Sequence, residues 1–260
     1  MINTSLTFLM DSLNQLLWPF LRISAFMVAA PFFSLDAMSV RIRIAVAVVL
    51  TLYAANVIPV NAVDPLSVDG LLQLCLQVYI GALLGFSLQV VNAAVIVAGQ
   101  VISNSMGLGF ASMVDPNLGN VPVLSQLLVI IATLLFLSVG GHLLVIELLL
   151  ESFQGIPVGA IPALGEWFDA LMAWTPYIFT AGLFIALPML VSLLVVNIGL
   201  GIVTRSAPAL NIISVGFPAI IVSGVLMINL AMPGILATIE DLWATAFQVM
   251  QSLAGGGSGI

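Results

Sequence analysis

Few side chains in this sequence of 260 residues could take part in acid–base or nucleophilic chemistry. The single histidine is His142, and the carboxylates closest to it along the chain are Glu147 and Glu151. The two glutamates are four residues apart and would share a helix face, whereas His142 lies well off that face. A proton or ion relay through His142 and Glu147 is one interpretation. The other is a structural histidine beside Gly140 and Gly141, which the isolation of this residue favours.

No enzyme or metal motif accompanies these residues. The sequence lacks a Gly-x-Ser-x-Gly elbow, a Walker loop, a His-Glu-x-x-His pair and a nucleotide-binding glycine fingerprint. Its His, Cys, Asp and Glu residues do not have metal-ligand spacing. Cys75 is the single cysteine, so an internal disulfide is excluded and a buried, inert thiol is expected. We therefore expect no enzyme activity, no cofactor and no metal ion.

A stripe of small and polar residues marks one long apolar stretch. It begins with the Gly-xxx-Gly pair Gly81 and Gly85 and continues with Gln89 and Asn92. These three- and four-residue steps place all four on one helix face. Small residues let helix backbones approach closely, and amides can hydrogen-bond across the contact. Packing within the protein or against a partner is the favoured interpretation, and a face toward a wet pore is the alternative.

The stripe leads into the most unusual segment of the chain, residues 103–116, which read Ser-Asn-Ser-Met-Gly-Leu-Gly-Phe-Ala-Ser-Met-Val-Asp-Pro. The segment is too apolar for an exposed loop and too rich in glycine for a stable helix. Gly107 allows a sharp bend, and Met106, Phe110 and Met113 offer bulky, deformable apolar tips. Two hypotheses stay open: a constriction that closes a pore by apolar contact, and a buried connecting loop.

Composition decides the environment of these residues. The chain is 62% hydrophobic and 6% charged, with a net charge of -7 and no lysine. So few charges cannot cover a surface that faces water, which excludes a soluble globular domain, and the high hydrophobicity excludes disorder. An acidic chain without a basic patch would repel nucleic acid. The class that remains is an all-α membrane protein, in which Arg22 must lie near an interface, be paired, or lie out of lipid.

Six apolar stretches must position these residues. We expect a single polytopic helical membrane domain over residues 1–254, followed by a flexible Gly/Ser tail over residues 255–260. It would contain about six long, partly broken apolar helices and a short C-terminal helix over Ile235–Leu253. The second stretch is too short for lipid, and breaks or kinks are expected in the fifth at Pro176 and Pro188. The uneven lengths favour helices that pack mainly on other protein. The six stretches are Asn14–Phe33, Ile44–Ile58, Leu71–Ile102, Val123–Leu150, Trp167–Thr204 and Asn211–Met232.

Several short motifs occur in order along the chain. They are Phe110-Ala-Ser-Met-Val-Asp-Pro116, Gly141-His142-Leu143, Ile156-Pro157-Val158-Gly159, Ala186-Leu187-Pro188, and Arg205-Ser-Ala-Pro208 followed by Asn211 and Gly216-Phe217-Pro218. Together these motifs resemble the R-subunit family of the flagellar type III export gate, the FliR family. The similarity runs over most of the chain, and the joint order of the motifs is specific although each is short. Two positions depart from the family pattern: Ala209 stands where glutamine is usual, and Met113 stands where a second aromatic residue is common.

The resemblance implies a structural and gating subunit of a protein-export pore. It implies assembly with the P and Q subunits, FliP and FliQ, a neighbouring switch subunit FlhB, and transient contact with unfolded export substrates. The place implied is the bacterial inner membrane, in contact with lipid, at the flagellar basal body. In the family, the segment that matches Met106, Gly107, Phe110 and Met113 is a constriction against leakage. The alternative is a secondary transporter or ion-conducting membrane protein that uses His142 and Glu147, although the sequence shows no inverted repeat.

Overall fold

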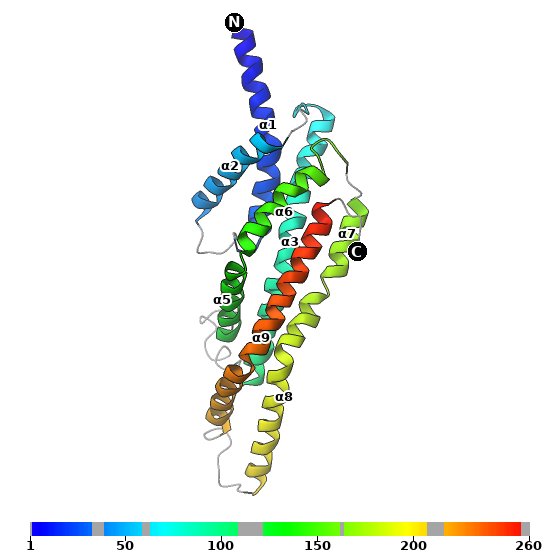
Figure 1. Ribbon diagram of the computed structural model, residues 1–260. Helices are drawn as coiled ribbons and strands as arrows, with labels where there is room; N and C mark the ends of the chain where they lie inside the picture. Colours follow the sequence, from blue (N-terminus) through cyan, green and yellow to red (C-terminus); the bar gives the residue numbers. More distant parts are fainter. Residues whose placement is uncertain are drawn as a thin grey trace. The chain divides into compact units, whose positions relative to one another are not determined.

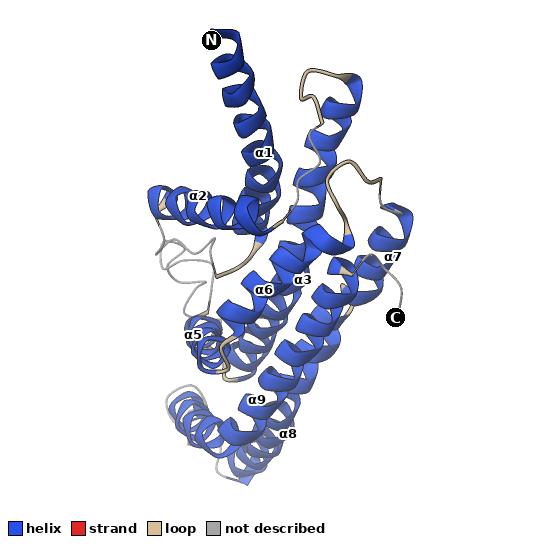
Figure 2. Ribbon diagram, turned by 45° about the horizontal axis from the view of Figure 1, so that its top comes forward, coloured by secondary structure: helices blue, strands red, loops and turns tan. Residues whose placement is uncertain are grey.

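A computed structural model describes residues 2–32, 39–58, 63–108, 122–161, 164–206 and 216–255. Within these ranges the chain forms helices joined by short loops and turns, and no strand is present (Figure 2). Figure 1 labels the helices in chain order. They are α1 (Ile2–Ala29), α2 (Val40–Val57), α3 (Val68–Ser105), α5 (Val123–Ser138), α6 (Gly141–Gly155), α7 (Leu164–Trp174), α8 (Tyr177–Ser206) and α9 (Phe217–Ala254).

Four of the described helical segments are long and apolar enough to cross a membrane. They are α2, α3, the segment Gly165–Ser206 that contains most of α7 and all of α8, and α9. The bent pair of α5 and α6 supplies a fifth if the two helices form one span. The expected all-α membrane protein is therefore confirmed.

The fourth and last apolar stretches differ from their expected forms. The stretch expected as one helix over Val123–Leu150 is divided into α5 and α6, which are bent by 69°. Gly140 lies at the break with φ 74°, in the left-handed region that favours glycine. Pro233, in contrast, lies inside α9, so the expected separate helix Ile235–Leu253 is the final part of a single helix of 38 residues. Membrane helices tolerate such a proline because neighbouring groups satisfy the freed carbonyl.

The second and fifth apolar stretches differ in part from the expected helix length and the expected breaks at proline. The second stretch is not too short for a span, because α2 begins at Val40 and has 18 residues. At 1.5 Å per residue this length is about 27 Å, close to the ~30 Å thickness of a hydrocarbon core. The break expected at Pro176 is confirmed, since α7 ends and α8 begins around it. No break occurs at Pro188, which lies inside α8.

The chain divides into two compact units, and α3 and α9 each contribute to both. Unit 1 comprises Met1–Val90, Gly140–Thr175 and Thr245–Ile260, and unit 2 comprises Val91–Val139 and Pro176–Ala244. In the most apolar part of α3, 61% of the residues are buried, against 11% in the corresponding part of α9. Helix α3 is therefore the most enclosed of the candidate spans, and the other spans expose much of their apolar surface.

In unit 1, α1 and α3 touch through glycine. A Cβ atom added at Gly85 would lie 2.7 Å from the Cβ of Ala29 and 2.9 Å from the backbone nitrogen of Ala30. A Cβ added at Gly81 would collide with the carbonyl oxygen of Arg22. Such contacts require glycine, because any side chain would separate the two backbones. The largest fully buried side chains of the described chain include Trp18, Ile23 and Phe26 of α1 and Ile80, Leu84 and Leu88 of α3.

We expect Gly85→Ala to lower the free energy of unfolding by about 1–3 kcal/mol, the usual scale for overpacking. The added methyl group meets backbone atoms of α1, which cannot move aside as a flexible side chain could. Helix propensity alone would favour alanine over glycine by about 1 kcal/mol, so the sign of the effect is informative. Thermal unfolding in detergent, followed by circular dichroism, measures it.

The control is Gly199→Ala in α8, where an added Cβ would have no atom within 4 Å. This variant should be neutral or slightly stabilising. A melting temperature for Gly85→Ala equal to or above that of the control would show that α1 and α3 are not in close contact.

Candidate constriction site and the buried arginine

Helix α3 ends in a glycine cap directly before the segment that the sequence marks as unusual. Gly107 has φ 76°. The Leu108 amide donates a hydrogen bond to the Ser103 carbonyl at 3.0 Å, and the Gly107 amide donates to the Asn104 carbonyl at 3.0 Å. This pair of bonds is a Schellman motif, in which a left-handed glycine lets the chain satisfy the last carbonyl groups of a helix. Gly107 therefore fixes the point at which α3 stops.

Met106, the residue before this cap, is buried in unit 2 with 1% of its surface exposed. Its side chain lies against Gly224 of α9, where an added Cβ would be 2.8 Å from the Met106 sulfur and 2.9 Å from its Cγ. Of the four residues predicted to form a constriction, Met106 and Gly107 are thus placed, whereas Phe110 and Met113 lie outside the described residues. The constriction itself stays a prediction.

Helix α5, which follows residues 109–121, is held against α3 in the same unit. The Ser125 hydroxyl donates a hydrogen bond to the Ile96 carbonyl at 3.0 Å. A Cβ added at Gly99 would lie 2.7 Å from the Ser125 backbone nitrogen, so the two helices meet at a glycine. The described residues on both sides of 109–121 are therefore fixed, one side by the Gly107 cap and Met106, the other by Ser125.

The four residues of the small and polar stripe on α3 lie in two kinds of environment. Gly81 and Gly85 contact α1 within unit 1. Gln89 and Asn92 are only partly buried. The Gln89 Oε1 atom is inaccessible to solvent and has no hydrogen-bond partner among the residues that the structure describes. A contact of Gln89 and Asn92 with a partner stays a prediction.

The polar centre of unit 1 is Arg22, whose side chain is fully buried. Its Nε donates a hydrogen bond to Gln77 Oε1 at 2.8 Å. One terminal nitrogen donates to the Ser152 carbonyl at 2.8 Å and to the Ser152 hydroxyl at 3.1 Å. The other donates to the Ile156 carbonyl at 2.9 Å. The guanidinium carbon lies 4.1 Å from the centroid of the Phe153 ring, a cation–π geometry. Arg22 thus lies within the protein rather than in lipid, one of the options left open by the sequence.

Two glutamines extend this cluster along α3. The Gln77 amide donates to Gln73 Oε1 at 3.2 Å, and the Gln73 amide donates to the Ala160 carbonyl at 3.2 Å. The partners of Arg22 in these hydrogen bonds are all neutral. The sequence pattern singles out Arg22 but not Gln73 and Gln77. Two amides four residues apart in an apolar helix are nevertheless a visible signal of a shared polar contact.

The other candidate residues are not brought together. His142 is partly buried, and its Nδ1 has no hydrogen-bond partner within the described ranges. Glu147 and Glu151 are exposed. No group of three or more potential metal ligands occurs among the described residues. Cys75 is exposed on α3, so the expectation of a buried thiol was wrong; in a membrane protein an apolar sequence context does not distinguish the core from an outward face. Nothing in this arrangement favours the relay.

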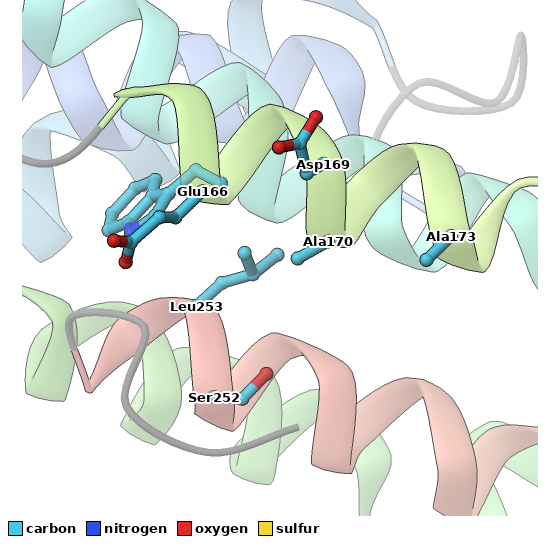
Figure 3. Close-up of a pocket in the computed structure, with 7 residues that line it drawn as sticks. Glu166, Asp169, Ala170, Ala173, Ser252 and Leu253 are labelled. Carbon is cyan, nitrogen blue, oxygen red and sulfur yellow. The ribbon is translucent and has the colours of Figure 1, made fainter.

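A cavity of about 420 Å³ lies in unit 1 between α7 and the C-terminal end of α9. Figure 3 shows Leu253 of α9 pointing toward Ala170 of α7, while the Asp169 carboxylate points away from α9. Glu166, Ala173 and Ser252 also line this space. The two carboxylates do not converge on one point, so the cavity does not have the geometry of a catalytic pair.

Comparison with known proteins assigns the chain to one family over most of its length. The family model described as bacterial export proteins, family 1, matches residues 13–246. The flagellar biosynthetic protein FliR of Pectobacterium carotovorum subsp. carotovorum is 39% identical over 241 residues, 92% of each chain. The FliR of Escherichia coli strain K12 is 37% identical over 242 residues, 93% of each chain. The FliR of Aquifex aeolicus is 28% identical over 245 residues, 93% of this chain and 94% of its own.

We expect Arg22→Lys to lower the free energy of unfolding by about 2–4 kcal/mol. A lysine ammonium lacks the planar fork of donors and would leave buried carbonyl and amide oxygens without partners. Chemical unfolding in detergent measures the change. Arg205→Lys is the matched control, because Arg205 is exposed, and its effect should be small. Equal stability of the two variants would mean that the Arg22 cluster does not hold unit 1 together.

We expect Gly107→Ala to cost about 1–2 kcal/mol, because a left-handed backbone conformation is strained for any residue with a Cβ. Gly201→Ala in α8 is the control, since the space around that glycine is open. Hydrogen exchange of the amides in the last turn of α3 reports the change locally. Equal protection of these amides from exchange in Gly107→Ala and in the control would contradict the glycine cap.

Proposed function

Because the chain belongs to the bacterial export proteins of family 1, the FliR family, we propose that it is a structural and gating subunit of the flagellar type III protein-export gate. Family membership and apolar helices make it an integral membrane protein of the flagellar export apparatus. The finer proposal is that it forms part of the pore through which unfolded substrates leave the cell. The proposed location is the bacterial inner membrane at the flagellar basal body.

The observation that carries the gating role is the termination of α3. A fully helical span of 38 residues stops at a glycine cap, and the residues on both sides of 109–121 are fixed to unit 2. Apolar constrictions close pores by excluding water, so they need bulky side chains on a segment whose ends are held in place. We assign this role to Met106, Gly107, Phe110 and Met113, with Phe110 and Met113 as the barrier.

The proposed partners follow from the exposed apolar surface. On α8 alone, Phe179, Phe184 and Val195 are each at least 66% exposed, and only 11% of the most apolar part of α9 is buried. Lipid can cover part of such a surface, and helices of other subunits can cover the rest. We propose that the P and Q subunits, FliP and FliQ, pack on it, that the switch subunit FlhB lies nearby, and that unfolded substrates make transient contact.

Deletion of residues 107–113 should make the assembled gate leak ions. The deletion removes the proposed barrier but leaves Met106 and all helices of unit 2 in the chain. Uptake of a small ionic dye by cells that carry the variant measures the leak. Gln154→Ala, which shortens an exposed polar side chain of α6 in unit 1, is the control and should keep the barrier intact.

Assembly must be measured in the same cells. Gentle-detergent purification followed by mass spectrometry should recover FliP and FliQ with both the deletion variant and the control. A deletion variant that assembles with these subunits and keeps a tight ion barrier would refute the constriction. A natural chain that purifies alone, without any of these subunits, would refute the proposed assembly.

A further inference from the structure

We infer that Met106 is an anchor, a residue that holds the end of α3 in place, rather than part of the barrier. Its side chain packs on Gly224 of α9, which we call the seat. The inference refines the proposed function, on which its physiological meaning rests. Among the four residues assigned to the constriction, it separates one that holds the end of α3 in place from those that would meet the pore. Gly224, which no sequence motif marks, becomes a positioning residue.

The burial pattern of α9 points to this contact. Between residues 217 and 230, Gly224 is the one buried residue, while Val222 and Val225 are 61% and 59% exposed. Cγ, Sδ and Cε of Met106 are the three atoms nearest to a Cβ added at Gly224. This part of α9 is therefore covered at Gly224 by the Met106 side chain, which fills the notch that the missing side chain leaves.

The position of Met106 in the chain gives the contact a consequence. Met106 is immediately followed by Gly107, whose cap ends α3. A displacement of Met106 therefore displaces the end of α3 and the point from which residues 109–121 begin. The N-terminal half of α9 thus sets the position of that point.

Methionine suits an anchor that must release. Its side chain is unbranched, with three rotatable bonds, so it can leave a shallow notch without rotation of either helix. A β-branched residue would be stiffer at χ1 and would tie the two helices together more rigidly. A movement of α9 away from α3 would separate Gly224 from Met106 and free the end of α3. Such a movement would therefore couple α9 to the opening of the proposed pore.

A cysteine pair tests the contact without reference to function. The experiment uses the full chain with the substitutions Cys75→Ser, Met106→Cys and Gly224→Cys. An added Cβ at Gly224 lies 2.9 Å from the Met106 Cγ atom, so its distance from the Met106 Cβ atom exceeds this value by at most one carbon–carbon bond. That separation is within disulfide reach of about 3.5–4.5 Å. The pair should form a disulfide in the assembled complex on mild oxidation, as detected by mass spectrometry of the linked peptides.

Met106→Cys combined with Gly234→Cys is the matched control pair. Gly234 lies ten residues further along α9, about 15 Å at the rise of a helix, and this pair should stay reduced. Equal rates of disulfide formation in the two pairs would overturn the anchor, whether or not the constriction exists.

A size swap tests the consequence of the contact. Gly224→Leu should expel Met106 and raise the ion leak on the order of tenfold, the scale by which overpacking of a tight contact shifts an equilibrium. Adding Met106→Ala should return the leak toward the natural level, because the side chain on α9 then fills the vacated space. Gly234→Leu, at a position with open space, should not leak.

The outcomes separate the two proposals. A leak from Gly224→Leu that the second substitution does not relieve, or that equals the leak from Gly234→Leu, would overturn the anchor. If Gly224→Leu does not assemble, the cysteine pair still decides whether Met106 meets Gly224. If the cysteine pair forms but deletion of residues 107–113 leaves the barrier tight, the proposed constriction fails while the contact stands.

Discussion

A buried positive charge constrains the packing of unit 1. A guanidinium group carries five N–H donors, and removing it from water is costly unless these donors find acceptors. Arg22 meets the requirement with Gln77 of α3, Ser152 of α6, and the Ile156 carbonyl just beyond α6. Each acceptor belongs to a segment far from Arg22 in sequence. All of these hydrogen bonds can therefore form only when α1, α3 and α6 are correctly placed relative to one another. A single arginine thus specifies the arrangement of three helices that apolar packing alone would leave loosely defined.

Close approach of backbones is the second constraint, and it applies in both units. Lipid tails are as apolar as leucine, so burial of apolar surface does little to drive helices together in a membrane, and van der Waals contact at small residues takes its place. Gly85 brings α3 against α1, and Gly99 brings α3 against α5. Gly182 of α8 approaches the Ala94 carbonyl of α3, where an added Cβ would be 2.9 Å away. Helix α3 therefore acts as the common packing surface in each unit, in agreement with its high burial.

The termination of α3 joins this packing to the proposed function. The helix that makes the closest contacts is also the one that ends at the Gly107 cap. A rigid, enclosed helix would be a suitable support for the proposed constriction, which would have to hold its position and still yield. The exposed apolar surfaces of α8 and α9, in contrast, are unlike the buried core of a self-sufficient domain. Their chemistry fits lipid and the helices of neighbouring subunits, so the fold is consistent with one part of a larger assembly.

The sequence by itself determined the class of protein, because so few charges over so long a chain permit only membrane-embedded helices. It also located the break at Pro176 and the bend at Gly107, because proline and glycine act through local backbone geometry. The same reasoning did not distinguish Pro176 from Pro188, which lies inside α8. The tertiary structure alone decided which groups meet Arg22, at separations of 55, 130 and 134 residues. It likewise decided that Cys75 faces outward, that Met106 points to Gly224, and that Pro233 continues a helix. These features depend on which surfaces lie opposite one another, and a local pattern of residues carries no information about a distant neighbour.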